Sequence, residues 1–220
     1  MFLGGFDHND ELVAVITLGW GVRPLHTIRK LFPSLESKDY LEIGKMCLDD
    51  KMPRNSESQF LSKCFKYVKK EKPEVKLIFT WADGMLGKPG YVYQASNFLY
   101  GGYIWTDSYF TNEGEKVHPR TIVSKTGKRP SWEFIKENGW MHFRGKQFRY
   151  IYFLCNKKEK KRLLAESEFD WGITNMPKEK DLEWKKKTDE GWVFAESPEY
   201  NKTALNFYNT KRDDYIDVEI

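Results

Sequence analysis

A helix with one apolar face, placed between two apolar strands, constrains the fold of this chain more than any other feature of its sequence. Residues 40–48 (Y-L-E-I-G-K-M-C-L) and 75–81 (V-K-L-I-F-T-W) predict strands, because apolar and β-branched residues dominate them. Between them, apolar residues recur at helical spacing and predict a helix from Asn55 to about residue 70. Asn55 or Ser56 can cap this helix, in a sequence with the spacing of a capping box.

Similar patterns predict further elements on both sides of this unit. Strands are expected at residues 11–20, 103–110, from 116 onward and at 147–154, and helices at 91–99, 131–137 and 156–167. Residues 21–37 are expected to be irregular between Pro24 and Pro33, and only loops and aromatic anchors are expected from Trp171 on. This order predicts an α/β or α+β fold, in which helices flank a mixed central sheet.

The length of 220 residues fits one domain with an appendage, and 16% aromatic residues can fill a substantial core. We expect a catalytic core over residues 1–122, with a C-terminal extension over residues 123–220 packed on it. No uncharged stretch is both long and apolar enough to span a bilayer. Cys47, Cys64 and Cys155 lie in apolar surroundings and too far apart for a zinc site, so reduced core thiols of a cytoplasmic protein are predicted.

The charge is distributed unevenly along the chain. Residues 121–162 contain 12 basic and 3 acidic residues, whereas residues 163–220 contain 8 basic and 14 acidic ones. A basic block with interleaved aromatic residues is typical of a surface that contacts nucleic-acid phosphates, although a basic run is also typical of a solvated helix face. The cations expected to hold phosphates are Arg23, His26, Arg29 and Lys30, together with Lys125, Lys128 and Arg129.

Two places in the sequence suggest chemistry. The start of the helix after residue 55 offers free backbone N–H groups, and Arg54 beside it can add a contact to a bound anion. Asp83 ends a buried strand before a glycine-rich loop, and Tyr93 follows in the next short helix, so the two can serve as general base and general acid in one crevice. The alternatives are an ordinary capped helix with a surface arginine, a turn aspartate and a packed tyrosine.

Three segments in this order resemble a known family. The order of strands and helices, with Y-Q-A-S-N-F-L-Y-G-G from Tyr93, looks like the N-acetyltransferase fold known as GNAT. More specifically, residues 53–58 (P-R-N-S-E-S), 81–84 (W-A-D-G) and 92–98 (V-Y-Q-A-S-N-F) together resemble the Mom family of phage DNA-modification proteins. The likeness runs roughly over residues 12–120. It implies a transferase that adds a carbamoylmethyl-type group to the exocyclic amine of adenine in DNA, which protects the DNA from restriction.

The resemblance also implies roles for single residues. Asp83 and Tyr93 match the family's strand-end aspartate and helix tyrosine, which makes them the expected catalytic pair. The positions expected to bind the cofactor are Lys45, Arg54, Asn55 and Ser56. The implied donor is acetyl-coenzyme A or a related acyl or glycyl donor, with any metal left open. Acetyltransferases of this fold hold the coenzyme A pyrophosphate with a glycine-rich loop, and residues 50–55 contain no glycine.

The implied partner is double-stranded DNA of the phage genome, with no membrane contact and a homodimer left open. Since the amine of a paired adenine lies inside the duplex, the base has to be extruded before it can react. Two other functions fit the same residues. One is an acetyltransferase that uses acetyl-coenzyme A on a small amine, and the other is a DNA-binding protein without enzymatic activity.

Overall fold

A computed structural model describes residues 1–21, 23–117 and 119–199, without the side chains of residues 120, 125 and 126. The strands are β1 (Phe2–Phe6), β2 (Leu12–Gly19), β3 (Tyr40–Leu48), β4 (Leu77–Asp83), β5 (Leu99–Phe110), β6 (Lys116–Val117), β7 (Met141–Phe153), β8 (Trp184–Thr188) and β9 (Gly191–Ala195). The α-helices are α1 (Pro24–Leu31), α2 (Ser56–Glu71), α3 (Tyr91–Ala95), α4 (Pro119–Thr126), α5 (Trp132–Glu137) and α6 (Lys157–Glu166). Short 3-10 helices are η1 (Ser37–Asp39), η2 (Gly84–Leu86) and η3 (Glu179–Asp181).

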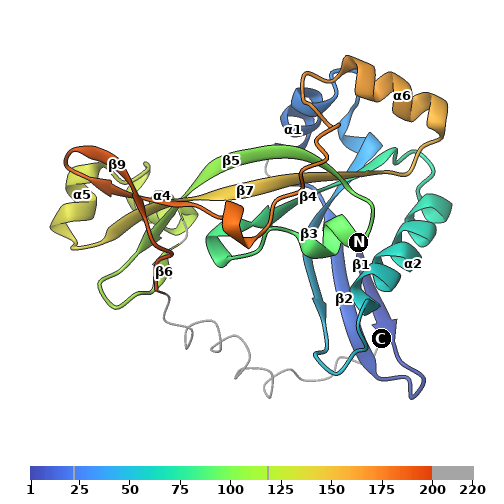
Figure 1. The fold of residues 1–220 in the computed structure, drawn as a ribbon, viewed down its shortest axis with the longest axis horizontal. Coiled ribbons are helices and arrows are strands. Elements are labelled where there is room, and N and C mark those ends of the chain that lie inside the picture. The colour runs from blue at the N-terminus through green and yellow to red at the C-terminus, as the bar shows by residue number, and fades with distance from the viewer. Residues whose placement is uncertain (22, 118, 200–220) are drawn as a thin grey trace. The chain divides into compact units, whose positions relative to one another are not determined.

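The strands form one mixed sheet in the order β1-β2-β3-β4-β7-β5-β6 (Figure 1). In addition, β8 pairs with β7, and β9 pairs with β8. β3 and β4 pair in parallel, while β2 with β3 and β4 with β7 pair antiparallel. Helix α2 is the crossover that a parallel pair of neighbouring strands requires. The expected mixed sheet flanked by helices is therefore confirmed.

Helices cover both faces of the sheet around β4. On one face, Leu61 and Phe65 of α2 pack with Ile78 of β4 in a buried cluster. On the other face, Ile28 of α1 and Leu163 of α6 pack with Phe79, also of β4. Ile78 and Phe79 are neighbours in the chain, and successive side chains of a strand point to opposite faces, so β4 supplies both clusters. This explains why its sequence is continuously apolar rather than alternating.

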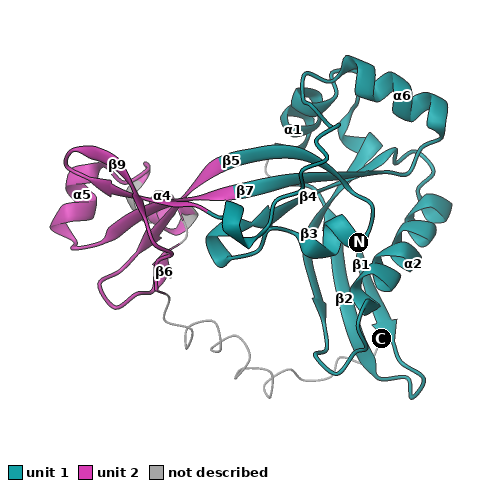
Figure 2. Cartoon of the chain, in the orientation of Figure 1, with its two compact units in different colours: residues 1–104, 147–182 teal, residues 105–146, 183–220 magenta. Residues whose placement is uncertain are grey.

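The chain forms two compact units, and each is made of two separate segments (Figure 2). Unit 1 contains residues 1–104 and 147–182, and unit 2 contains residues 105–146 and 183–220, of which 200–220 lie outside the described residues. β5 and β7 pass from one unit into the other, because the boundaries at 104/105 and 146/147 fall within these two strands. The expected division into a catalytic core to residue 122 and an extension after it concerns function, and it stays a prediction.

Four expectations about secondary structure were wrong. The strand expected from residue 116 onward ends at Val117, and the helix α4 covers Pro119–Thr126. Residues 24–31 form α1 instead of an irregular segment, because Pro24 occupies the first helical turn, where its missing N–H is not needed, and Ile28 and Leu31 are buried. β1 was not expected, and it pairs with β2 from Phe2 to Phe6. β8 and β9 form a hairpin where only loops were expected, since a run of three lysines does not resemble a strand.

Two local details also differ from expectation. Asn55 adopts a left-handed conformation (φ 72°) at the start of α2, and neither its side chain nor a capping box caps the helix. The Ser56 hydroxyl instead donates to the Pro53 carbonyl over 2.7 Å. α3 ends at Ala95 rather than near residue 99, because Asn97 takes a left-handed φ of 62° and starts the turn into β5.

The three cysteines form no disulfide with one another, and only Cys64 is a core thiol. Cys47 is exposed and Cys155 is partly exposed, which corrects the expectation that all three are buried. No helix within the described ranges combines the length and the apolar character that crossing a membrane requires.

Candidate functional site

The candidate site lies where two parallel strands separate. β3 and β4 pair only between Tyr40–Glu42 and Leu77–Phe79, although β3 continues to Leu48 and β4 to Asp83. The carboxyl halves of the two strands therefore diverge. Ligands of open sheets that contain parallel strands bind at the carboxyl ends of the strands, and a gap between two such strands gives them room to enter.

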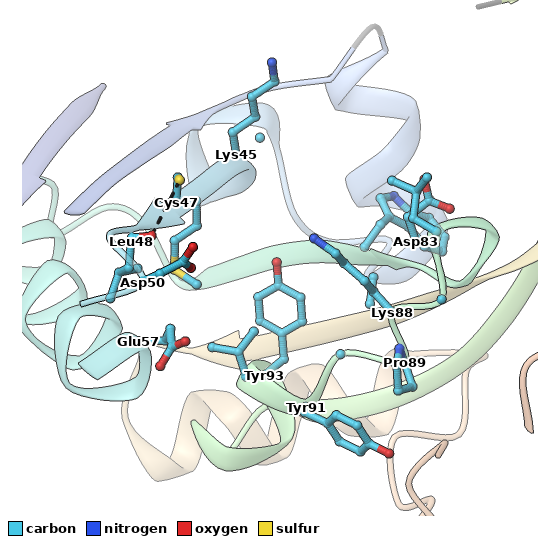
Figure 3. Close-up of a pocket in the computed structure, with 18 of the residues that line it drawn as sticks. Lys45, Cys47, Leu48, Asp50, Glu57, Asp83, Lys88, Pro89, Tyr91 and Tyr93 are labelled. Carbon is cyan, nitrogen blue, oxygen red and sulfur yellow. Dashed lines mark hydrogen bonds between the residues drawn. The ribbon is translucent and has the colours of Figure 1, made fainter. Parts of the chain in front are cut away.

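A cavity of about 930 Å³ occupies this gap, and all of its lining residues belong to unit 1. Its walls are residues 44–50 and Met52 from β3 and the loop after it, Glu57 of α2, residues 81–83 of β4, residues 86–93 of the next loop and α3, and Glu179. Figure 3 shows the Tyr93 phenol and the Lys88 ammonium pointing into the cavity, whereas Tyr91 points away from it. The volume falls within the range of small-molecule sites.

The loop after β4 is held in place by its own backbone and by β7. The Asp83 carboxylate accepts from the Met85 N–H over 3.0 Å and so caps η2. Tyr150 of β7 donates its hydroxyl to the Pro89 carbonyl and accepts from the Gln94 amide over 3.1 Å. These bonds fix both ends of the loop, and therefore the position from which α3 begins.

Gly90 is required where this loop meets α3. Its φ is +94°, and a Cβ on it would lie 2.6 Å from Cε2 of Tyr150 and 3.0 Å from the Ala82 Cβ. A side chain here would be strained by the backbone conformation and would also collide with a buried ring. The close approach of loop and ring places Tyr93, three residues later, over the cavity.

Tyr93 is packed so that its phenol stays protonated. Its ring centroid lies 5.2 Å from that of Phe98 and 5.5 Å from that of Tyr150. Burial raises the pKa of Tyr93 above its usual value, and the Thr80 hydroxyl acts in the opposite direction. A protonated phenol at the wall of a cavity can donate a hydrogen bond or a proton, and the role of Tyr93 as general acid stays a prediction.

Asp83 and Lys45, two more of the expected site residues, line the same cavity. Asp83 is the last residue of β4, as the sequence predicted, and Lys45 lies on the diverging half of β3. The structure therefore brings Asp83, Tyr93 and Lys45 to one cavity from three different elements. The carboxylate and the phenol can accept a proton and donate one, whereas Figure 3 shows the Lys45 side chain extending away from the Tyr93 phenol.

The start of α2 contributes less than expected. Arg54, Asn55 and Ser56 do not line the cavity, whereas Glu57 of the first helical turn does. Asp49 and Asp50 also line it, so its wall near α2 carries three carboxylates. These carboxylates repel a diphosphate, and the loop before the helix contains no glycine that would let backbone N–H groups approach one. The residues at this end of the cavity do not fit the coenzyme A pyrophosphate.

Lys88 and Cys47 line the cavity and were not singled out from the sequence. Lys88 lies between Gly87 and Pro89, and its backbone N–H donates to the Asp83 carbonyl over 3.1 Å. Its position in the glycine-rich loop after Asp83 is the feature of the sequence that could have indicated Lys88 as a cavity residue. Cys47 is exposed because it lies on the part of β3 that has separated from β4. No cluster of three or more metal-ligating side chains occurs among the residues that the structure describes.

The cations expected to hold phosphates are placed in both units. Arg23, His26, Arg29 and Lys30 are exposed on unit 1, where three of them follow one another along α1 at helical spacing. Lys128 and Arg129 are exposed in unit 2, just after α4. The side chain of Lys125 lies outside the described residues.

Comparison with known proteins identifies the family. The model of the Mom protein family matches residues 1–169. The chain belongs to the Mom family. It is 35% identical over 166 residues to the methylcarbamoylase mom of Escherichia phage Mu, in an alignment that covers 74% of this chain and 67% of that protein. The family match includes every cavity residue except Glu179, and it ends before the hairpin β8–β9.

Proposed function

We propose that this Mom family protein is a DNA-modifying transferase, which adds a carbamoylmethyl-type group to the exocyclic amine of adenine and so protects phage DNA from restriction. The likeness to a methylcarbamoylase supports the type of group. The observation that carries the proposal is the meeting of Asp83, Tyr93 and Lys45 at one cavity of about 930 Å³. A DNA base and a small donor need such a space, because they must both leave bulk solvent to react.

The proposed reaction exchanges one bond for another. A bond forms between the exocyclic nitrogen of adenine and the methylene carbon of an activated donor, while the bond from that carbon to its leaving group breaks and the leaving group takes the electron pair. Asp83 accepts the proton lost from the amine, and Tyr93 donates a proton to the leaving group. The raised pKa of Tyr93 keeps this proton on the phenol at neutral pH. Each such proton transfer typically contributes about 10²–10⁴-fold to a rate.

Lys45 and Lys88 contribute positive charge to the cavity wall, in contrast to the carboxylates near α2. Both are cavity residues, and both can contact a polar or anionic group of the donor. The carboxylates near α2 disfavour a diphosphate there, so the donor proposed is a small compound with a carbamoylmethyl group whose methylene carbon bears a leaving group. DNA is proposed to contact the exposed cations of α1, since phosphate contacts supply most of the sequence-independent affinity for DNA.

Mass spectrometry of nucleosides from cells that express the chain tests the proposal. We expect a modified deoxyadenosine with the wild-type chain, and a loss of about 10²–10⁴-fold with Asp83→Ala or Tyr93→Phe. Tyr67→Phe is the matched control, because Tyr67 loses the same hydroxyl, is exposed on α2 and does not line the cavity. It should modify DNA like the wild type.

Full modification by Tyr93→Phe or by Asp83→Ala would disprove the assigned roles. A wild-type chain that leaves DNA unmodified would disprove the proposed function. In that case, stabilisation by acetyl-coenzyme A without affinity for DNA would identify an acetyltransferase, and salt-sensitive DNA binding would identify a binding protein without activity.

A further inference from the structure

The hairpin β8–β9 is held rigidly in unit 2, although it lies outside the range of the family match. β8 pairs with β7, where Lys185 lies opposite Arg144. Before β8, Glu183 forms an ion pair with the nearly buried Lys146 over 3.0 Å. At the turn, the Asp189 carboxylate accepts from the Trp132 indole and from Lys136, each over 2.8 Å. Anchors at both ends fix which face the hairpin presents.

One face of this hairpin alternates lysines with aromatic rings. Lys185 pairs with Phe194 and Lys187 with Trp192, and residues paired across two strands share a face. The Lys185 ammonium lies 4.4 Å from the ring centre of Trp105 on β5 and 4.7 Å from that of Phe194. This face, defined by Trp105, Lys185, Lys187, Trp192 and Phe194, is called the hairpin face below.

The hairpin face carries two lysines, and the carboxylates described near it are bound mainly to other cations. Asp107 is bound by Arg144 over 2.7 Å and by His142 over 3.0 Å. Burial opposes ionisation of Asp107, but these hydrogen bonds outweigh it and lower its pKa to about 2. Within the described ranges, neither Lys185 nor Lys187 forms an ion pair. Asp189 attracts Lys187 electrostatically but is bonded to Lys136, so the ammonium groups of Lys185 and Lys187 can still contact an anionic partner.

One ring of the hairpin face is largely exposed, whereas Trp105 and Trp192 are half-buried. The Phe194 side chain is 71% exposed, on a strand whose position is fixed. An exposed aromatic ring flanked by ammonium groups suits a nucleobase, which stacks on the ring while its phosphates contact the lysines. A purely apolar partner would bury the ammonium groups without compensating their charge.

We propose that the hairpin face binds unpaired nucleotides of the DNA strand, with a base stacked on Phe194 and phosphates near Lys185 and Lys187. This inference rests on the proposed function, in which the DNA is opened to extrude an adenine. Opening of the duplex leaves unpaired nucleotides with incomplete stacking, and such nucleotides are the ligand proposed for the hairpin face. The region beyond the family match would then contribute DNA contacts of its own.

Binding of a labelled single-stranded oligonucleotide to the full chain, measured by fluorescence anisotropy at several salt concentrations, tests this inference. Phe194→Leu should weaken binding by about 5- to 150-fold, whereas Phe194→Tyr, which keeps a ring, should bind like the wild type. Lys187→Gln should reduce the salt dependence by about 0.7 in the slope of log K against log salt. Lys186→Gln is its matched control, because Lys186 loses the same charge on the same strand but lies on the opposite face, 5.9 Å from the Phe143 ring.

Equal binding by Phe194→Leu and the wild type, or equal slopes for Lys187→Gln and Lys186→Gln, would overturn the inference. Leu and Tyr variants that both bind normally would indicate a nonspecific apolar surface. Thermal melting of each variant shows whether it is folded, and the exposure of Phe194 makes unfolding unexpected. If the wild-type chain modifies DNA while Phe194→Leu binds normally, only the inference about the hairpin face fails. If the wild-type chain leaves DNA unmodified, the proposed function is refuted instead.

Discussion

Replacement of Gly90 by alanine tests how the loop between β4 and α3 is held, and a matched control lies in the same loop. Gly90 and Gly87 both have positive φ values, +94° and +74°, so alanine is strained at both. A Cβ at Gly87 meets nothing within 4 Å, whereas at Gly90 it meets Cε2 of Tyr150 at 2.6 Å. The difference between the two variants therefore isolates the collision with the Tyr150 ring from the strain of the backbone.

The expected magnitudes follow from these contacts. A left-handed backbone costs about 1–2 kcal/mol for an L-residue, and alanine recovers about 0.4–1 kcal/mol by restricting the unfolded chain. Gly87→Ala should therefore lower the free energy of unfolding by about 1 kcal/mol. Gly90→Ala adds overpacking of about 1–3 kcal/mol, because Tyr150 is held by Pro89 and Gln94 and cannot move aside freely. We expect Gly90→Ala to be less stable than Gly87→Ala by about 1–3 kcal/mol.

Urea unfolding followed by tryptophan fluorescence measures the two free energies, and nucleoside mass spectrometry measures activity at a temperature where both variants are folded. Gly90→Ala should also lose more modification activity than Gly87→Ala. The Tyr93 N–H donates to the Gly90 carbonyl over 2.9 Å, so a displacement of Gly90 also displaces the Tyr93 phenol. If the two variants unfold within about 0.5 kcal/mol of each other, the packing argument is refuted.

Four further outcomes are expected. Gly101→Ala should be severely destabilised, because its Cβ would lie 2.2 Å from the Trp171 ring, and thermal melting measures this. The lowered pKa of Asp107 stabilises the fold above pH 3.8 by on the order of 1 kcal/mol after solvent screening. This stabilisation is lost as the pH falls towards 2. In acid titrations followed by circular dichroism, Asp107→Asn should lack this loss of stability. Asn156→Ala should remove the cap of α6 and about 1 kcal/mol of unfolding free energy in urea. Because burial raises the pKa of Tyr93, any loss of modification rate from its ionisation should begin at a higher pH than for an ordinary tyrosine, and a pH–rate profile checks it.

The sequence was sufficient where local pattern decides the structure. The strand at Tyr40–Leu48 has the predicted bounds, and α2 follows its apolar stripe, because both patterns report directly on burial. Asp83 at a strand end and Tyr93 in a short helix could be placed for the same reason. Their position in one crevice was predicted only from the order of strands and helices, and the structure shows that both residues line one cavity.

What could not be predicted depends on contacts between distant segments. The cavity exists because β3 and β4 stop pairing after Glu42 and Phe79, and no local pattern marks that point. β8 is a strand because it pairs with β7, although its three lysines disfavour an isolated strand. Lys88 enters the cavity because the loop around it is pinned by Tyr150, 62 residues later in the chain.

The separation of β3 and β4 has a consequence for how this family can change. An opening created by the course of two backbones persists when the side chains along it are exchanged, provided that the shared stretch at Tyr40–Glu42 still holds the strands together. Substitutions at Lys45, Cys47 or Lys88 then alter what the opening accepts without closing it. A few changes on the rim can therefore alter which small molecules the opening admits while the backbone around it stays the same.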